Sequence, residues 1–163
     1  SQPPFFSMMV GILQAAKGDK ILEAYLPALE KEYNFWMDGV DQLSPELTTY
    51  RRVVLMPNGA VLNRYWDDHP SPRPEAYTED LHVAKASNKN PQEVYRHIRA
   101  AAESGWDFSS RWFADAQEMH TIQTTDIIPV DLNCLLLQLE KILLACYQQN
   151  KNQDAVLVFT KKI

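Results

Sequence analysis

The 163-residue sequence has little cysteine, no excess of positive charge and no long apolar run, and each shortage excludes a class of protein. The two cysteines, Cys134 and Cys146, lie about 18 Å apart if they share one helix, which is too far for a disulfide. A net charge of -5 provides no basic patch for phosphates, so we expect neither nucleic acid nor an anionic membrane as a partner. No apolar run approaches the roughly 18 residues of a membrane span.

Motifs for metals and phosphates are also missing. The four histidines do not have the spacing of a zinc-binding helix, and no glycine-rich loop is present that would cradle a phosphate. Neither a zinc site nor a nucleotide site is therefore predicted.

Helical periodicity dominates what is present, and the predicted class is mainly α in a single segment over residues 1–163. Residues 6–16 are apolar on nearly every face, which predicts a helix buried all round. The period continues over 21–40, where Pro27 predicts either a kink or the start of a second helix. A strong apolar stripe predicts another helix over 131–149.

Two local signals define further elements. Apolar residues on both sides of Pro57-Asn58-Gly59 predict a β-hairpin between Arg52 and Tyr65, with Asn-Gly in the turn. Asn90-Pro91 is typical of a helix start, and Gly105 suits the residue just beyond its end.

The loop over residues 66–75 contains prolines at alternate positions, which indicate a stiff, extended backbone. In such a segment Arg73 and Glu75 point the same way, so they could act as one polar clamp on sugar hydroxyls. The alternative is a surface ion pair that contributes little.

The stretch Glu103-Ser104-Gly105-Trp106-Asp107-Phe108-Ser109-Ser110-Arg111-Trp112 places a carboxylate among aromatic residues, just after a helix end. Desolvation by aromatic surface raises the pKa of a carboxyl group, as a general acid requires. The alternative is a packed helix terminus with a solvated Asp107. The candidate acids in polar or loop contexts are Asp67, Asp68, Glu75, Asp107 and Asp126.

Other side chains have two interpretations each. Trp66, Trp106 and Trp112 could be stacking platforms, whereas Trp36 lies on a helical stripe and is expected in the core. Asn63 could reach a ligand or could belong to a strand end or turn.

The motifs together resemble those of the α,α-trehalases, which are inverting glycoside hydrolases. The resemblance covers residues 1 to about 150, in the order Ser1-Gln2-Pro3-Pro4-Phe5-Phe6, residues 62–68 (LNRYWDD), Pro72-Arg73-Pro74-Glu75, residues 103–112 and residues 128–133 (IPVDLN). It does not extend to residues 155–163, so the assignment of 151–163 is open.

This resemblance implies part of an (α/α)6 toroid with one β-hairpin insertion, hydrolysis of trehalose to glucose, and no metal or organic cofactor. It implies that Asp107 is the general acid and that Arg73, Pro74, Glu75 and Gly105 contact the substrate.

An inverting enzyme also needs a carboxylate base roughly 6.5 to 9.5 Å from the acid. In trehalases that base lies near QWD and GGGGEY-type motifs, which are missing here. We therefore expect an internal fragment that is inactive alone, with the remainder of the catalytic domain as a partner. The alternative is a non-catalytic carbohydrate-binding or structural helical fragment. The compartment stays open, with a periplasmic or secreted location favoured over the cytoplasm.

Overall fold

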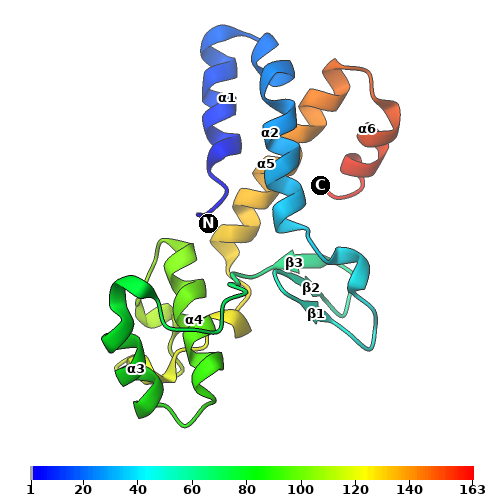
Figure 1. Cartoon of the computed structure of the whole chain (residues 1–163). Coiled ribbons are helices and arrows are strands. Elements are labelled where there is room, and N and C mark those ends of the chain that lie inside the picture. Colours follow the sequence, from blue (N-terminus) through cyan, green and yellow to red (C-terminus); the bar gives the residue numbers. More distant parts are fainter. Residues whose placement is uncertain (1) are drawn as a thin grey trace. The chain divides into compact units, whose positions relative to one another are not determined.

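A computed structural model describes residues 2–163 of the chain, which form two compact units. Unit 1 comprises residues 2–3 and 39–129, and unit 2 comprises Pro4–Asp38 and Val130–Ile163. Figure 1 labels the α-helices and the strands of both units. Helices outweigh strands throughout, which confirms the predicted mainly α class.

Unit 2 consists of helices only. They are α1 (Phe6–Lys17), α2 (Lys20–Trp36), α5 (Val130–Gln149) and α6 (Gln153–Thr160). Helix α5 packs against each of the other three, and α1 also packs against α2 (Figure 1). Leu29, Leu139 and Leu143 are fully buried between these helices, and Trp36 is in the core as predicted.

Helix α1 differs from the prediction of a helix buried all round. Only Ser7 and Val10 are buried, whereas Met9 and Ile12 have exposed fractions of 63% and 72%. The reason is that α2 and α5 cover one side of α1, and no described element covers the other. A helix that is apolar on every face can be buried on every face, but whether a face is buried depends on the elements that pack against it.

Helix α2 runs without interruption through Pro27, so Pro27 does not begin a second helix, which was one of its two predicted effects. The preceding helix ends at Gly18, whose φ of +85° is a conformation that side chains with a Cβ rarely adopt. That glycine separates α1 from α2 and lets the two helices pack as neighbours.

Unit 1 contains a small antiparallel sheet in the order β1 (Thr49–Tyr50), β2 (Val53–Leu55) and β3 (Val61–Asn63). The predicted hairpin is confirmed as β2 and β3, with Val54 opposite Leu62, and β1 adds a third strand. Gly59 turns the hairpin with a φ of +84°, and the Asn58 side chain accepts a hydrogen bond from the Ala60 amide. Strand β1 was not predicted, because its two exposed residues carry no alternating pattern.

The rest of unit 1 is helical or irregular. It contains α3 (Tyr77–Ala86), α4 (Pro91–Ser104) and the short 3-10 helices η1 (Val40–Gln42), η2 (Pro74–Ala76), η3 (Ser110–Trp112), η4 (Met119–Thr121) and η5 (Thr124–Asp126). The Asn90 side chain caps α4 by accepting from the Gln92 amide, and Gly105 ends it with a φ of +72°, both as predicted. The buried face of α4 includes Val94, Ile98 and Ala101, and it packs against α3 and η5. This helix therefore fixes the segment that leads to Asp107.

No helix in residues 2–163 combines the length and the apolar character needed to cross a membrane.

Candidate functional site

An open pocket of about 330 Å³ lies within unit 1. Its lining is mostly charged and comes from the N-terminal segment, the proline-rich loop and helix α4. The lining residues are Gln2, Asp67, Arg73, Pro74, Glu75, Arg99, Ala102 and Glu103. Three of the five site residues that the family resemblance implies, Arg73, Pro74 and Glu75, line this pocket, whereas Gly105 and Asp107 do not.

Arg73 is held rigidly by Asp80, a residue in the first turn of α3. The Asp80 carboxylate accepts hydrogen bonds from the Arg73 backbone amide at 2.8 Å, from Nε at 3.1 Å and from Nη2 at 2.7 Å. Asp80 is fully buried, so this is an ion pair shielded from water. Bidentate geometry fixes both the position and the plane of the guanidinium group.

Glu75 lies close to Arg73 but not in the predicted extended segment. Arg73 is extended, with ψ of 137°, whereas Pro74 begins the 3-10 turn η2 that contains Glu75. Proline at the first position of a helical turn is favoured because its φ is already helical. The two side chains still line one pocket, although Arg73 pairs with Asp80 and not with Glu75.

Asp107 follows the left-handed Gly105 and is exposed, as the solvated alternative predicted. Trp106 is also 51% exposed and carries the Arg111 guanidinium 3.9 Å from its ring centre. Trp112 is buried against Tyr65, with ring centres 6.0 Å apart, so it belongs to the core. The predicted aromatic enclosure of Asp107 is therefore not formed by the described residues.

Arg73 connects the proline-rich loop to the segment that carries Asp107. Its guanidinium carbon lies 4.6 Å from the centre of the Phe108 ring. The pKa of Arg73 is raised, first by its hydrogen bonds to Asp80 and further by the charges of Glu75 and Asp107. Both candidate carboxylates thus lie within the electrostatic reach of one arginine.

A buried ion pair fixes the backbone next to the pocket. Arg52 Nη2 lies 3.4 Å from Glu103 Oε1 and donates to the Trp66 carbonyl at 2.8 Å. Glu103 Oε2 accepts from the Trp66 amide at 3.0 Å. Burial raises the pKa of Glu103, and the Arg52 charge opposes that shift. The pair therefore holds Trp66 by both of its backbone polar groups.

The remaining candidate acids have different surroundings. Asp67 lines the pocket, and its Oδ1 lies 3.0 Å from Arg99 Nε. Asp68 forms a bidentate ion pair with Arg51 at the surface, at 2.9 and 2.6 Å. Asp126 is exposed beside the His97 ring, outside the pocket. Only Asp67 of these three takes part in the pocket.

Asn63 and Trp66 are now placed as well. Asn63 is buried at the end of β3 opposite Val53, so it has the strand-end position that was one of its two interpretations. The guanidinium carbons of Arg64 and Arg96 lie 4.8 and 4.6 Å from the centre of the Trp66 ring. It is packed by protein groups and not presented as an open stacking platform.

Sequence reasoning gave no role to Gln2, Arg99 or Glu103. Gln2 belongs to a motif that was quoted only for the resemblance. Arg99 and Glu103 are four residues apart on α4, a spacing that places both on one face of a helix. That spacing was a usable signal, but nothing in the sequence places the face beside Asp67.

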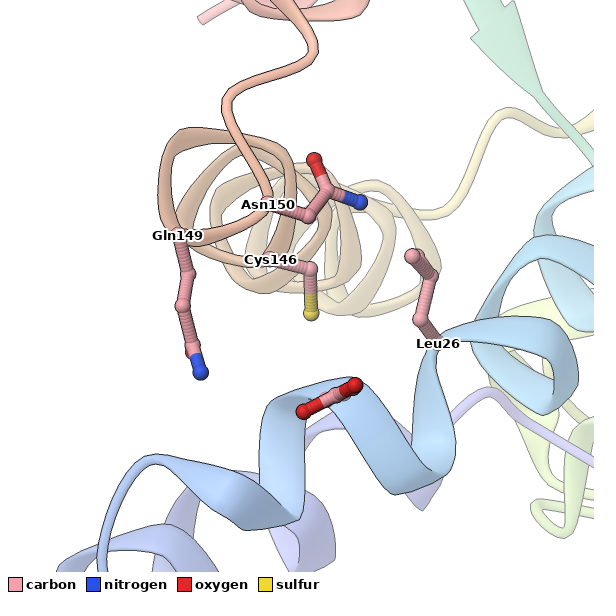
Figure 2. Close-up of a pocket in the computed structure, with 5 residues that line it drawn as sticks. Leu26, Cys146, Gln149 and Asn150 are labelled. Carbon is pink, nitrogen blue, oxygen red and sulfur yellow. The ribbon is translucent and has the colours of Figure 1, made fainter.

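Unit 2 contains a second, smaller pocket of about 200 Å³, lined by Glu23, Leu26, Cys146, Gln149 and Asn150. Figure 2 shows the Cys146 thiol at the C-terminal part of α5, pointing toward α2. Its Sγ lies 3.7 Å from the Leu22 carbonyl, and burial raises the pKa of the thiol to about 11. Across residues 2–163, no group of three or more His, Cys, Asp or Glu side chains is arranged to hold a metal ion.

Comparison with known proteins identifies the family. The family model for trehalase matches residues 1–163, which is the whole chain. The chain belongs to the trehalase family. The match includes the pocket of unit 1 and the helices of unit 2.

Similar curated proteins are periplasmic trehalases from Salmonella. Those of Salmonella newport and Salmonella choleraesuis are 55% identical over 144 residues, and that of Salmonella schwarzengrund is 54% identical over the same length. Each alignment covers 88% of this chain and 25% of the relative. The chain therefore spans about a quarter of the length of these trehalase-family relatives.

Proposed function

We propose that this chain takes part in the hydrolysis of α,α-trehalose to two glucose molecules with inversion of configuration. Asp107 acts as the general acid, and Arg73, Pro74, Glu75 and Gly105 contact the sugar. The observation that carries the proposal is the trehalase-family match over residues 1–163, together with a pocket that Arg73, Pro74 and Glu75 line. Because the relatives are named periplasmic trehalases, we propose the periplasm as the compartment.

The pocket has the chemistry that sugar recognition needs. A sugar hydroxyl both donates and accepts hydrogen bonds, so a site that binds several hydroxyls needs both kinds of partner. Arg73 supplies donors, Glu75 supplies acceptors, and the amide of Gln2 supplies both. No metal or organic cofactor is part of this chemistry.

In the proposed reaction Asp107 protonates the glycosidic oxygen while a carboxylate base activates water on the opposite face of the ring. A general acid must keep its proton at the working pH, and desolvation favours the protonated form. Asp107 is exposed in this chain, so we propose that bound sugar and further protein enclose it. Arg73, fixed by Asp80, lines the pocket and interacts electrostatically with Asp107.

We propose that the base lies outside residues 1–163. The relatives are about four times as long as the aligned segment, which leaves room for it. The 163-residue chain is then expected to bind trehalose without releasing glucose. Robust glucose release that disappears in Asp107→Asn would contradict this part of the proposal, because it would require a base within the chain.

A chimera tests the role of Asp107 directly. The aligned 144 residues would replace their counterparts in the Salmonella newport protein, which is 55% identical over that stretch. We expect the chimera to release glucose from trehalose and the Asp107→Asn chimera to lose about 10²- to 10⁴-fold in kcat, the usual contribution of general acid catalysis.

Asp41→Asn is the matched control, because Asp41 is exposed in unit 1 and does not line the pocket. It is expected to leave kcat unchanged. An active chimera that keeps its kcat in Asp107→Asn would refute the assignment of the acid. A well-folded chimera that binds trehalose but never hydrolyses it would favour the non-catalytic carbohydrate-binding alternative.

A further inference from the structure

The pocket of unit 1 contains a second pair of opposite charges, Asp67 and Arg99, to which the family resemblance assigns no substrate contact. Asp67 follows the strand β3 by four residues, and Arg99 lies on α4. Arg99 Nε and Asp67 Oδ1 are 3.0 Å apart, and the two side chains are 19% and 28% exposed. Both line the pocket, so a ligand there meets them directly.

This pair differs from Arg73–Asp80 in the atoms that it leaves free. Asp80 occupies Nε and Nη2 of Arg73 and uses both of its own oxygens. The contact between Arg99 and Asp67 is through Nε, at ion-pair distance but without the angle of a hydrogen bond. Within residues 2–163, Asp67 Oδ2 and both terminal nitrogens of Arg99 make no hydrogen bond. The pair therefore presents one acceptor and two donor nitrogens to the pocket.

The backbone under Asp67 is fixed before any ligand binds. Asp67 Oδ1 accepts from the His69 amide at 2.7 Å, and the Asp67 carbonyl accepts from Arg96 Nε at 3.2 Å. The preceding Trp66 is held through its amide by Glu103 and through its carbonyl by Arg52. Groups that are already positioned lose less entropy on binding, which favours their use in recognition.

We propose that Asp67 and Arg99 form a second hydroxyl-binding pair, which selects a pyranose by the position of its hydroxyl groups. Asp67 Oδ2 accepts from one hydroxyl, and the terminal nitrogens of Arg99 donate to the same or the neighbouring one. This inference rests on the proposed function for its substrate class and names the residues that determine specificity. Adjacent hydroxyls suit it because each needs a donor and an acceptor within a short distance.

Calorimetric titration of the 163-residue chain tests the pair, with trehalose and with its symmetric dideoxy analogues, in which the same hydroxyl is missing from both glucose rings. Removing a charged hydrogen-bond partner of a ligand hydroxyl is expected to lower the affinity for trehalose about ten- to hundred-fold in Asp67→Asn and in Arg99→Gln. One dideoxy analogue should bind equally well to the parent chain and to Asp67→Asn, because it lacks the hydroxyl that Asp67 contacts. All other analogues should bind the variant more weakly.

The variants are chosen so that folding does not decide the result. The amide side chain in Asp67→Asn still has an oxygen that can accept from the His69 amide, so this variant retains the turn. Asp68→Asn is the matched control, because Asp68 is the next residue, pairs with Arg51 and does not line the pocket. Its affinity for trehalose should equal that of the parent chain. Arg99→Lys keeps the charge without the planar fork and should recover only part of the affinity.

The outcomes also separate this inference from the proposed function. An equal loss of affinity for every analogue would show a structural effect of Asp67 and would overturn the inference. Unchanged affinity in both variants would also overturn it. The same holds if the parent chain binds no sugar. Binding of maltose but not of trehalose, with the same dependence on Asp67, would overturn trehalose as substrate and support the pair. A catalytic chimera that is insensitive to Asp67→Asn in KM and kcat would leave trehalose hydrolysis standing and overturn the inference.

Discussion

The two pockets of this chain differ in what their walls are made of. The pocket in unit 1 is lined by five ionisable side chains, namely Asp67, Arg73, Glu75, Arg99 and Glu103. The pocket in unit 2 has one acidic side chain, Glu23, beside a leucine, a buried thiol and two amides (Figure 2). Charged side chains of both signs are therefore concentrated in the pocket of unit 1, whereas the pocket of the helical unit has a single charged side chain.

The carboxylates of the two units are also used differently. In unit 2, Glu140 accepts from the Tyr33 hydroxyl at 2.9 Å and Glu30 from the Tyr147 hydroxyl at 2.6 Å. Both bonds join α2 to α5, and burial is the first cause that raises the pKa of each tyrosine. In unit 1 the carboxylates in and next to the pocket, Glu103, Asp80 and Asp67, face arginines. One unit uses carboxylates to hold helices together, and the other uses them to hold cations at a site.

The largest effect that tests this comparison is expected for Asp80→Ala. Removing one partner of a buried ion pair costs about 3–5 kcal/mol, because the other charge stays partly buried without compensation. The unit 2 counterpart, Glu140→Ala, removes a hydrogen bond to a neutral hydroxyl and should cost about 1–3 kcal/mol. Chemical denaturation of both variants measures the two free energies of unfolding.

Hydrogen exchange by mass spectrometry then locates each loss. Asp80→Ala should lower protection in peptides of residues 39–129, and Glu140→Ala in peptides of α2 and α5. Equal costs for the two variants, or a loss of protection spread over both units, would contradict the difference between them.

How much of the site could be predicted depends on the range of the interactions. The N-cap at Asn90, the left-handed Gly105 and the Asn58-Gly59 turn are local, since they depend on a few neighbouring residues, and all three were predicted correctly. Asp80 as the partner of Arg73 requires α3 to fold back onto the proline-rich loop, and Asp67 beside Arg99 requires residues 32 positions apart to meet. Such contacts follow from tertiary packing, which no single-sequence pattern encodes.

The exposed side of α1 was not predicted either, and the exposure of Asp107 was only one of its two interpretations, because burial also depends on tertiary packing. Sequence periodicity predicts that α1 can be buried, but its burial depends on neighbours, and the described residues cover one side only. Asp107 is comparable, because its sequence neighbours are aromatic while the fold turns Trp112 into the core and leaves Trp106 exposed. Neighbours in sequence are thus a weak guide to desolvation.

A smaller effect is expected from the buried His97 of unit 1, which has no counterpart in unit 2. Its Nδ1 accepts from the Thr125 amide at 3.2 Å, and its Nε2 lies within 4 Å of Lys89, Glu93 and Asp126. Burial, followed by the charge of Lys89, lowers the pKa of His97 below its ordinary 6.5. The unfolded chain therefore binds the proton first as the pH falls, and stability that is complete above pH 6.5 is lost below it.

The expected slope is at most about 1.4 kcal/mol per pH unit for one proton. Unfolding free energies between pH 7.5 and 5 for the parent chain and His97→Gln measure it, and the parent should lose stability more steeply. His82→Gln, an exposed histidine on α3, should change the slope little. Burial also raises the pKa values of Glu103 and Glu140. Their contributions to the pH dependence cancel when the unfolding free energy of His97→Gln is subtracted from that of the parent chain. Parallel curves for the parent and His97→Gln would refute this account.

The smallest effects on stability are expected for alanine at Gly105, which belongs to the proposed site, and at Gly59, which belongs to the hairpin turn. Gly105 and Gly59 both have positive φ values, +72° and +84°, and a Cβ on either would meet nothing within 4 Å. An alanine at either position should therefore cost about 1–2 kcal/mol through backbone conformation alone. Denaturation of Gly105→Ala and Gly59→Ala should give similar losses. If Gly105 lines the sugar as proposed, only Gly105→Ala should also raise the KM for trehalose in the active chimera. Equal KM values in the two variants would reduce Gly105 to a helix terminus and leave Asp107 without a sugar contact beside it.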